Sequence, residues 1–376
     1  MSASELRRDL LAWFAREARD LAWRRTQDPY AVWISEAMLQ QTRVEVVEPF
    51  FARFLARFPS VEALARAPED DVVAAWSGLG HYRRARAQRA AAAALVVRHG
   101  GRFPDTPAEA RALPGVGPYT AGAVLSIAYG VRAPVFDGNV ARVFARWFAL
   151  EQPLGSPALA RELWSRAEAL LPPAGAAAAE GPGAWNQAVM ELGALVCLPR
   201  APRCDVCPVA RHCAARAAGR ELELPRRAAR RAPVDVRLEV ALVARGASIL
   251  LERRPAEGRM AGMWELPTRE VPGPLGRLAG LWPAEFRPEL RELHACGEVA
   301  HTITHHRIRA RVRAAELAAP APPGTAWAGV AEAGELALSG MARKILRRFG
   351  ADLGAGKARG WRNGPLFALE TPRVDE

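Results

Sequence analysis

The chain has 376 residues, half of them hydrophobic, so it is long and apolar enough for two packed domains and is not an intrinsically disordered protein. Its formal net charge is +12, and nearly all of the positive charge is arginine, since Lys344 and Lys357 are the only lysines. Arginine makes planar, bidentate contacts with phosphate, so the charge favours a polyanionic partner. An alanine- and arginine-rich composition can also reflect the nucleotide bias of a genome, so charge alone does not identify that partner.

The first residues predict an amphipathic helix, because Leu6, Leu10 and Trp13 are spaced by three and four among charged residues. We therefore expect no signal peptide before this helix. The longest apolar runs, such as residues 90–97, are too short to span a membrane. We therefore expect a cytoplasmic protein without a membrane partner, whose cysteines are reduced and available to a metal.

The hydrophobic pattern predicts more than one domain. Residues 1–219 have the period of helices, with glycine or proline at the junctions. Residues 220–233 are basic and bounded by proline, which predicts a linker that could also contact a nucleic-acid backbone. Residues 234–349 contain β-type runs and a closing helix, which predict an α+β domain. The tail, residues 350–376, is polar and rich in glycine, and we expect it to be largely mobile.

Glu36 lies in the segment WISEAMLQQT, on a predicted helix, with Trp33, Met38 and Leu39 near it. A single glutamate on a helix is usually solvated. These apolar neighbours would instead remove it from water, which raises the pKa of a carboxylic acid and favours the protonated form near neutrality. The sequence leaves both interpretations open.

The segment LPGVGPYTAG, residues 113–122, predicts a turn between two helices. Gly115 and Gly117 permit positive backbone angles and a close approach, so amides at the start of the following helix could hold a DNA phosphate. Such a turn can also serve helix packing alone. Downstream, Asp137 precedes Gly138 and Asn139 in VFDGNV, which predicts a helix N-cap or a turn.

Four of the five cysteines form one cluster with the spacing C-x6-C-x2-C-x5-C. In a reducing compartment this spacing predicts a metal site, and four thiolates suit either a zinc ion or a cubane iron–sulfur cluster. Zinc ribbons usually have two short CxxC pairs, and only one is present, so we favour a 4Fe–4S cluster. Arginines in the loop predict a DNA-facing structural element. The predicted ligands are Cys197, Cys204, Cys207 and Cys213, whereas Cys296 is far away in the sequence and is expected to be an ordinary thiol.

Together, these segments resemble the helix-hairpin-helix DNA glycosylases with an iron–sulfur cluster and, among them, the adenine DNA glycosylases of the MutY type. The resemblance runs from about residue 21 to residue 348 and also rests on WSGLGHYRRAR (76–86), WNQAVMELGALVC (185–197) and HTITHH (301–306). It implies an all-α helix-hairpin-helix glycosylase domain with an iron–sulfur loop, followed by an α+β Nudix-like domain. It also implies a monomer that acts at the nucleoid on double-stranded DNA containing adenine opposite 8-oxoguanine or guanine.

The resemblance implies a catalytic set. Glu36 would be the general acid that protonates adenine N7, and Asp137 would stabilise an oxocarbenium-like sugar, with Tyr119 and Asn139 beside them. Bifunctional members of the superfamily have a lysine where Tyr119 lies, and this chain has no lysine before Lys344. We therefore expect a monofunctional glycosylase without strand-cleaving activity. Tyr119 could alternatively be an aromatic residue that packs beside the turn.

The resemblance also implies residues that bind DNA. Arg24 and Gln187 match the adenine pocket, although a surface arginine and a helix-face glutamine would fit the sequence equally well. Gln41 matches the wedge that fills the space left by an extruded base. His81 and Tyr82 stand where the family usually has two tyrosines, and the smaller ring of His81 weakens the expected stacking.

The second domain resembles a Nudix fold in which GMWELPTREVPGPLGRLAG replaces the glutamate-rich, magnesium-binding helix of a working pyrophosphatase. We therefore expect a catalytically inactive reader of 8-oxoguanine. Thr304 and His305 match the family's Phe-Ser-His lesion loop, and Ile303 replaces its aromatic residue. Three other functions stay open: an endonuclease III-like glycosylase/lyase for oxidised pyrimidines, a Nudix nucleotide hydrolase with a DNA-binding appendage, and a non-enzymatic iron–sulfur DNA-binding module.

Overall fold

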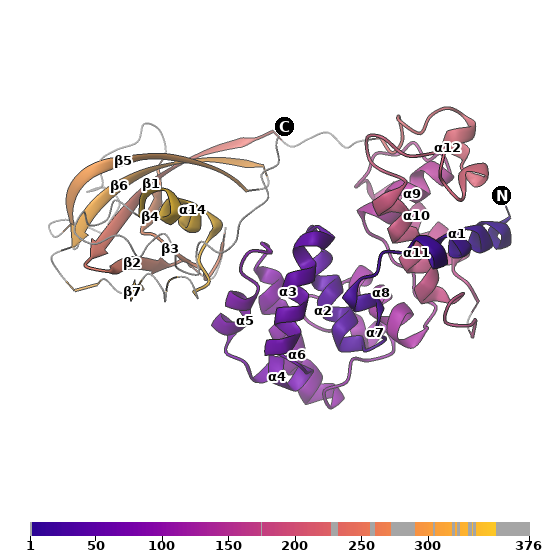
Figure 1. Cartoon of the computed structure of the whole chain (residues 1–376), viewed down its shortest axis with the longest axis horizontal. Coiled ribbons are helices and arrows are strands. Elements are labelled where there is room, and N and C mark those ends of the chain that lie inside the picture. Colours follow the sequence, from indigo (N-terminus) through magenta and orange to yellow (C-terminus); the bar gives the residue numbers. More distant parts are fainter. Residues whose placement is uncertain are drawn as a thin grey trace. The chain divides into compact units, whose positions relative to one another are not determined.

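The chain separates into two compact units in the computed structural model, a helical unit (Met1–Ala229) and a β unit (Arg230–Glu376), and each is described by itself (Figure 1). The predicted mobile tail lies outside the described residues, except for Gly350, and so does Thr304. For residues 290–293 only the backbone is described. The described residues are 2–173, 175–226, 232–255, 260–271, 290–303, 305–317, 320–321, 324–329, 333 and 336–350.

The helical unit has the all-α architecture that its hydrophobic period predicts (Figure 1). The helices begin at residues suited to helix starts: Pro29 opens α2 and Pro118 opens α8, where a missing N–H is not needed. Its helices are α1 (Ala3–Glu17), α2 (Pro29–Leu39), α3 (Val44–Arg57), α4 (Val61–Arg66), α5 (Glu69–Ala75), α6 (Arg83–His99), α7 (Pro107–Arg111), α8 (Pro118–Tyr129), α9 (Gly138–Trp147), α10 (Pro157–Leu170), α11 (Pro182–Leu195) and α12 (Ala214–Ala217), with short 3-10 turns at Ala22–Arg24 and Ala210–His212.

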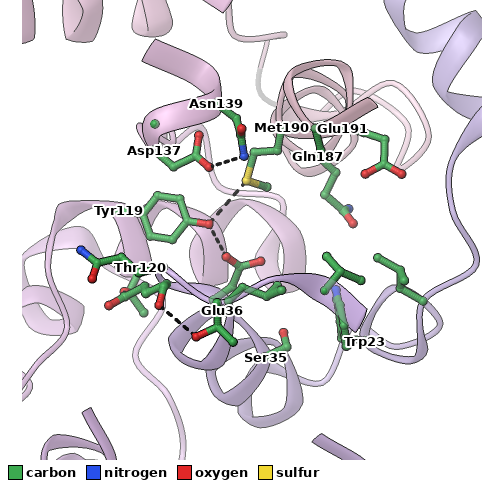
Figure 2. A pocket seen from close by; sticks show the side chains of 18 of the residues that line it. Trp23, Ser35, Glu36, Tyr119, Thr120, Asp137, Asn139, Gln187, Met190 and Glu191 are labelled. Carbon is green, nitrogen blue, oxygen red and sulfur yellow. Dashed lines mark hydrogen bonds between the residues drawn. The ribbon is translucent and has the colours of Figure 1, made fainter. Parts of the chain in front are cut away.

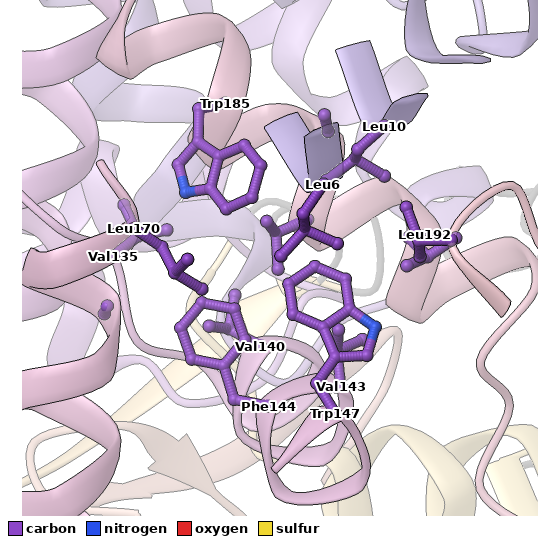
Figure 3. Close-up of a cluster of buried hydrophobic side chains, with 14 of the residues drawn as sticks. Leu6, Leu10, Val135, Val140, Val143, Phe144, Trp147, Leu170, Trp185 and Leu192 are labelled. Carbon is purple, nitrogen blue, oxygen red and sulfur yellow. The ribbon is translucent and has the colours of Figure 1, made fainter. Parts of the chain in front are cut away.

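The first helix of the chain packs with the last ones. Leu6 and Leu10 of α1 are fully buried against α9, α10 and α11, in a cluster that also contains Trp147 and Trp185 (Figure 3). The rings of these two tryptophans lie 6.2 Å apart between centroids, so large aromatic surfaces dominate this core. Helix α8 contacts both α2 and α11, and it thereby joins the α1/α9–α11 group to the helices before it.

The contact between α11 and α9 leaves no room for a side chain at Gly193. A Cβ at this position would lie 2.6 Å from the Cβ of Asn139 and 3.2 Å from the backbone of the same residue. The absence of a side chain therefore lets α11 approach the first turn of α9 closely, and this fixes where α9 begins.

Part of the segment that we expected to be a linker belongs to the helical unit. Leu224 is 1% exposed, and its carbonyl oxygen accepts a hydrogen bond from Arg146 Nε at 2.8 Å. Arg226 forms an ion pair with Glu151 at 2.9 Å. Residues 220–226 are thus held to the helices, whereas residues 227–231 lie outside the described residues.

The β unit has the α+β architecture expected from its sequence (Figure 1). Its sheet has the order β3-β2-β1-β6-β5, with β4 paired to β1 and β7 paired to β2. Strands β1 and β6 are parallel, whereas β5 and β6 are antiparallel and end with Ile303 opposite His306. Helix α14 buries Met341, Ile345 and Phe349 against the sheet. The elements are β1 (Val234–Arg245), β2 (Ser248–Arg253), β3 (Trp264–Glu265), β4 (Thr268–Glu270), β5 (Leu290–Ile303), β6 (His306–Leu317), β7 (Thr325–Gly329) and α14 (Gly340–Phe349).

Residues 272–289, which include the second half of the segment expected to replace the Nudix glutamate helix, lie outside the described residues. None of the helices within the described ranges combines the length and the apolar composition that crossing a bilayer requires.

Gly193→Ala should destabilise the helical unit by about 1–3 kcal/mol, because the new methyl group would overlap Asn139 and force α11 away from α9. Urea denaturation followed by circular dichroism measures this change. Ala184→Ser, at a half-buried position of the same helix, should change the free energy of unfolding by less than about 0.5 kcal/mol. Equal stability of the two variants would show that the contact at Gly193 is not tight.

Candidate active site

A cleft of about 1020 Å³ in the helical unit is lined by residues from α2, α8, α9 and α11 (Figure 2). Its volume is at the upper end of the range for small-molecule pockets, which is enough for a nucleobase with its sugar. The cleft brings together most of the residues that the sequence predicts for the site: Arg24, Glu36, Gln41, Gly115, Gly117, Tyr119, Asp137, Asn139 and Gln187.

Glu36 is a buried acid in this cleft. Every residue of α2 from Tyr30 to Met38 is buried, and Glu36 itself is 5% exposed. Burial raises the pKa of Glu36 to about 7, and the negative charge of Asp137 adds to the increase, while Tyr119 and Arg24 oppose it. The expectation that Glu36 is removed from water is therefore confirmed, and this burial favours its protonated form near neutral pH.

Tyr119 lies directly beside Glu36. Its hydroxyl group donates a hydrogen bond to Glu36 Oε2 at 2.5 Å and lies 3.5 Å from the sulfur of Met190 (Figure 2). Burial, together with the two nearby carboxyl groups, raises the pKa of Tyr119 far above its ordinary value, so the phenol stays neutral and acts as a donor. Tyr119 is therefore part of the cleft and does more than pack against the hairpin turn.

Asp137 is the N-cap of α9, as its place in the sequence predicts. Its Oδ1 accepts a hydrogen bond from the backbone N–H of Val140 at 2.7 Å, and its Oδ2 accepts one from Asn139 Nδ2 at 3.1 Å. Burial raises the pKa of Asp137, while these two hydrogen bonds and the charge of Arg142 oppose the increase. The hydrogen bonds from Val140 and Asn139 hold the carboxylate of Asp137 in a fixed orientation at the edge of the cleft.

Arg142, which sequence reasoning did not select, connects this cap to the cysteine cluster. It donates from Nη2 to Asn139 Oδ1 at 2.8 Å and from Nε to the carbonyl oxygen of Cys197 at 2.6 Å. The first bond orients the amide of Asn139 so that its N–H group faces Asp137. The only sequence signal for this role is the spacing of three residues from Asn139 on one helix.

A third carboxyl group in the cleft, that of Glu191, was also not predicted. It is 1% exposed and accepts paired hydrogen bonds from Arg19 and Arg24, at 2.7–3.0 Å. Burial alone would raise its pKa, but these bonds outweigh burial and lower the pKa of Glu191 to about 2. Arg24, predicted to line the base pocket, is therefore bound to Glu191 while it lines the cleft. Glu191 is four residues after Gln187, on the same side of α11.

The hairpin turn needs a glycine at one of the two predicted positions. Gly115 has a φ of +72°, and a Cβ there would lie 2.5 Å from the Cβ of Ala87. Gly117 has a φ of −84°, so our expectation of a positive angle there is wrong, since this residue is the extended N-cap of α8. No atom lies within 4 Å of a Cβ built on Gly117. This space leaves the first amides of α8 open to a phosphate.

The predicted wedge residues differ in their exposure. Gln41 and His81 are both exposed and have left-handed backbones, with φ of 59° and 49°. Tyr82 is 7% exposed and its ring packs in the core. Tyr82 is thus buried next to the exposed His81, and its contact with DNA stays a prediction.

The four predicted cysteine ligands line one cavity together with Arg146. Arg146 Nη1 donates to the sulfur of Cys197 at 3.1 Å. Burial raises the pKa of Cys207 to about 12, and the other cysteines add to this increase. Several negatively charged thiolates are therefore unfavourable in this cavity unless a cationic group lies among them. Among the described residues, no three histidine, cysteine or acidic side chains converge on a point that could hold one metal ion.

In the β unit, His305 lies at the end of β5 and β6. Its ring lies 4.2 Å from the ring of His306, and its carbonyl oxygen accepts a hydrogen bond from the N–H of Val234 at 2.8 Å. Ile303 packs against the core of the β unit. The other predicted lesion-loop residue, Thr304, lies outside the described residues.

The fold and the cleft define a base excision DNA repair protein of the HhH-GPD superfamily, which the chain matches over residues 34–168. Residues 239–348 match the NUDIX domain. A solved structure of a thermostable thymine-DNA glycosylase is 27% identical and has a TM-score of 0.50, over 57% of this chain and 97% of that one.

Curated relatives narrow this class further. The adenine DNA glycosylase of Homo sapiens is 34% identical over 91% of this chain and 73% of that protein. The adenine DNA glycosylase of Buchnera aphidicola (strain APS) is 36% identical over 55% of this chain and 57% of that protein. The chain belongs to the adenine DNA glycosylase family.

Glu36→Gln should stabilise the protein at high pH. The pKa of Glu36 in the folded chain, about 7, is above its ordinary value of 4.5, so its favourable contribution is present below pH 4.5 and is lost as the pH rises through 7. The variant should therefore be more stable than the native chain by up to about 3 kcal/mol at pH 8, and about equally stable at pH 4. Urea denaturation at both pH values measures the difference, and equal stability at pH 8 would contradict a buried acid.

Proposed function

We propose that the chain is a monofunctional DNA glycosylase that hydrolyses the N-glycosidic bond of adenine opposite 8-oxoguanine or guanine in double-stranded DNA. The observation that carries this proposal is a pair of carboxyl groups in one cleft with different surroundings, the buried Glu36 and the partly buried Asp137. The first is half-protonated near neutrality, and the second is held by donors that favour its ionised form. In such a pair, one carboxyl group can donate a proton while the other, as a carboxylate, stabilises positive charge on the sugar.

Glu36 supplies the proton. The protonated carboxyl group donates to N7 of an adenine in the cleft, the bond between C1′ and N9 breaks, and the base leaves with both electrons of that bond. Glu36 is then a carboxylate. It accepts a proton from the water that adds to C1′, which returns the acid to its starting state. Tyr119 holds the carboxyl group in one orientation during both transfers.

Asp137 stabilises the positive charge that develops on the sugar. Its oxygens accept from Val140 and Asn139, and this fixes the carboxylate without neutralising it by an ion pair. Because the chain has no lysine before Lys344, no side-chain amine is available to form a Schiff base with the opened sugar. The product is therefore an abasic site in an intact strand.

DNA binding follows from the surroundings of the cleft. The α8 N-terminus after Gly117 binds a phosphate, and Gln41 and His81 occupy the space left by the extruded base. Arg24 and Gln187, with Glu191, form the base pocket. His305 and Thr304 of the β unit contact the opposite 8-oxoguanine. The protein acts as a monomer in the cytoplasm, on nucleoid DNA.

A 4Fe–4S cluster is held by Cys197, Cys204, Cys207 and Cys213. When bound, it supplies a rigid cross-link among these four thiolates. The loop around it then presents arginines to the DNA backbone, and the bond from Arg142 to Cys197 fixes the loop to the cap of α9.

A single-turnover assay on an end-labelled duplex with adenine opposite 8-oxoguanine tests the proposal. Cleavage at the adenine is expected only after treatment with hot alkali, and Glu36→Gln should abolish it while leaving DNA binding intact. A duplex with adenine opposite thymine is the control. Cleavage without alkali would establish a glycosylase/lyase, and the absence of any product would direct the search to oxidised pyrimidines and to nucleotides.

Tyr119→Phe should move the pH dependence of excision. The hydrogen bond from Tyr119 favours ionised Glu36, so its loss should raise the pKa of Glu36 further. The acid then stays protonated to higher pH, and the alkaline decline of the single-turnover rate should move up by about one pH unit. Tyr129→Phe removes a hydroxyl group at the far end of α8. This variant should leave unchanged the midpoint of the alkaline decline, which is the pH at which the rate falls to half. A midpoint that stays or moves down in Tyr119→Phe would contradict this role.

A further inference from the structure

Arg84, in the first turn of α6, reaches the end of the helix that carries Glu36. Its Nη1 donates to the carbonyl oxygens of Ala37, at 2.8 Å, and Met38, at 3.0 Å. A third bond from the same nitrogen goes to the carbonyl oxygen of Gln40. Carbonyl groups at the carboxyl end of a helix have no hydrogen-bond partner within the helix. At the end of α2, one guanidinium nitrogen binds these groups.

The other side of the guanidinium group binds a second loop. Arg84 Nη2 donates to the carbonyl oxygens of Leu79 and Gly80, both at 3.3 Å, and lies 3.3 Å from the hydroxyl oxygen of Thr42. Gly80 also accepts a hydrogen bond from the indole of Trp76 at 3.2 Å. One side chain thus joins the turn after α2 to the turn before α6.

The charge of Arg84 is held without a carboxylate among the described residues. Its hydrogen bonds to the described residues all go to neutral oxygens, and its guanidinium carbon lies 5.6 Å from the centre of the Trp76 ring. Burial lowers the pKa of Arg84 to about 10. A partly buried cation whose described hydrogen-bond acceptors are all neutral is costly to the fold, so its presence calls for a role beyond stability.

The two turns that Arg84 joins are those of Gln41 and His81. Each of these residues directly follows a carbonyl group that Arg84 binds, on Gln40 and on Gly80. Both have left-handed backbones, which cost a non-glycine residue about 1 kcal/mol, and both side chains are exposed. The clamp by Arg84 holds both backbones in this conformation and fixes the spacing between the two side chains.

We propose that Arg84 is a positioning residue that makes Gln41 and His81 one rigid wedge, aligned with the helix that carries Glu36. This inference rests on the proposed extrusion of adenine from a duplex. The planar fork of arginine is needed, because its two terminal nitrogens face different loops. A lysine, which carries a single ammonium group on a flexible stem, can bind one loop but not both.

Arg84→Lys tests the clamp, with Arg98→Lys at the exposed far end of α6 as the matched control. Single-turnover excision by Arg84→Lys should fall at least tenfold, whereas the control should stay within threefold of the native chain. The second readout is the fluorescence of 2-aminopurine in place of the target adenine, opposite 8-oxoguanine. In the Glu36→Gln background, this signal reports unstacking of the base without excision. Adding Arg84→Lys should remove most of the fluorescence increase while the Kd for the duplex changes less than threefold.

A role in stability alone would lower the folded fraction, measured by circular dichroism, without changing the fluorescence of the folded complex, and this result would overturn the inference. So would excision by Arg84→Lys equal to that of the control. If Arg84→Lys does not fold, Thr42→Val, which removes the hydroxyl group between the two loops, should lower the fluorescence increase at least twofold, and an unchanged increase would count against the clamp. If the native chain releases no adenine from any duplex, the proposed function fails first, and the inference fails with it.

Discussion

The carboxyl group of Glu36 is taken out of water on a helix whose inner turns are all buried, and the rest of the cleft is arranged around this desolvation. A buried acid with a pKa of about 7 is unfavourable to the fold above neutral pH, so its neighbours must hold it without neutralising it by an ion pair. Tyr119 does so with one neutral hydroxyl group. An arginine in the same place would leave Glu36 permanently ionised and unable to deliver a proton.

Three carboxyl groups in one cleft, of which Glu36 and Glu191 are buried and Asp137 is partly buried, show how hydrogen-bond donors determine the charge of a carboxyl group. Burial raises the pKa of all three, yet Glu191 is lowered to about 2 because two arginines bind it. Asp137 receives a backbone and an amide donor, which orient it and favour its ionised form. Glu36 receives one phenol. One cleft thus contains a structural anion, an oriented carboxylate and an acid, and for the two buried glutamates the difference lies in the type and number of hydrogen-bond donors.

The sequence predicts the parts of this site that depend on local pattern. The apolar neighbours of Glu36 and the helix-start position of Asp137 are visible in short segments, and the order of helices and strands follows from hydrophobic period. Contacts between distant segments are not visible there. Arg84 resembles any other arginine on a basic helix until the turns of Gln41 and His81 are close to it. The buried ring of Tyr82 likewise depends on a backbone reversal that no pattern of residue types reports.

The packing of α1 against α9–α11 has a consequence for how the chain is made. Leu6, Leu10 and Trp13 leave the ribosome well before their partners on α11, such as Trp185, which lie near the end of the helical unit. Until then the first helix exposes its apolar face. Contacts of such long sequence separation slow folding, because much of the chain must be ordered before they form. The cleft, whose Glu191 binds the backbone N–H of Arg19 just after α1, therefore closes only after α11 has emerged, and a glycosylase interrupted before this helix has no base pocket.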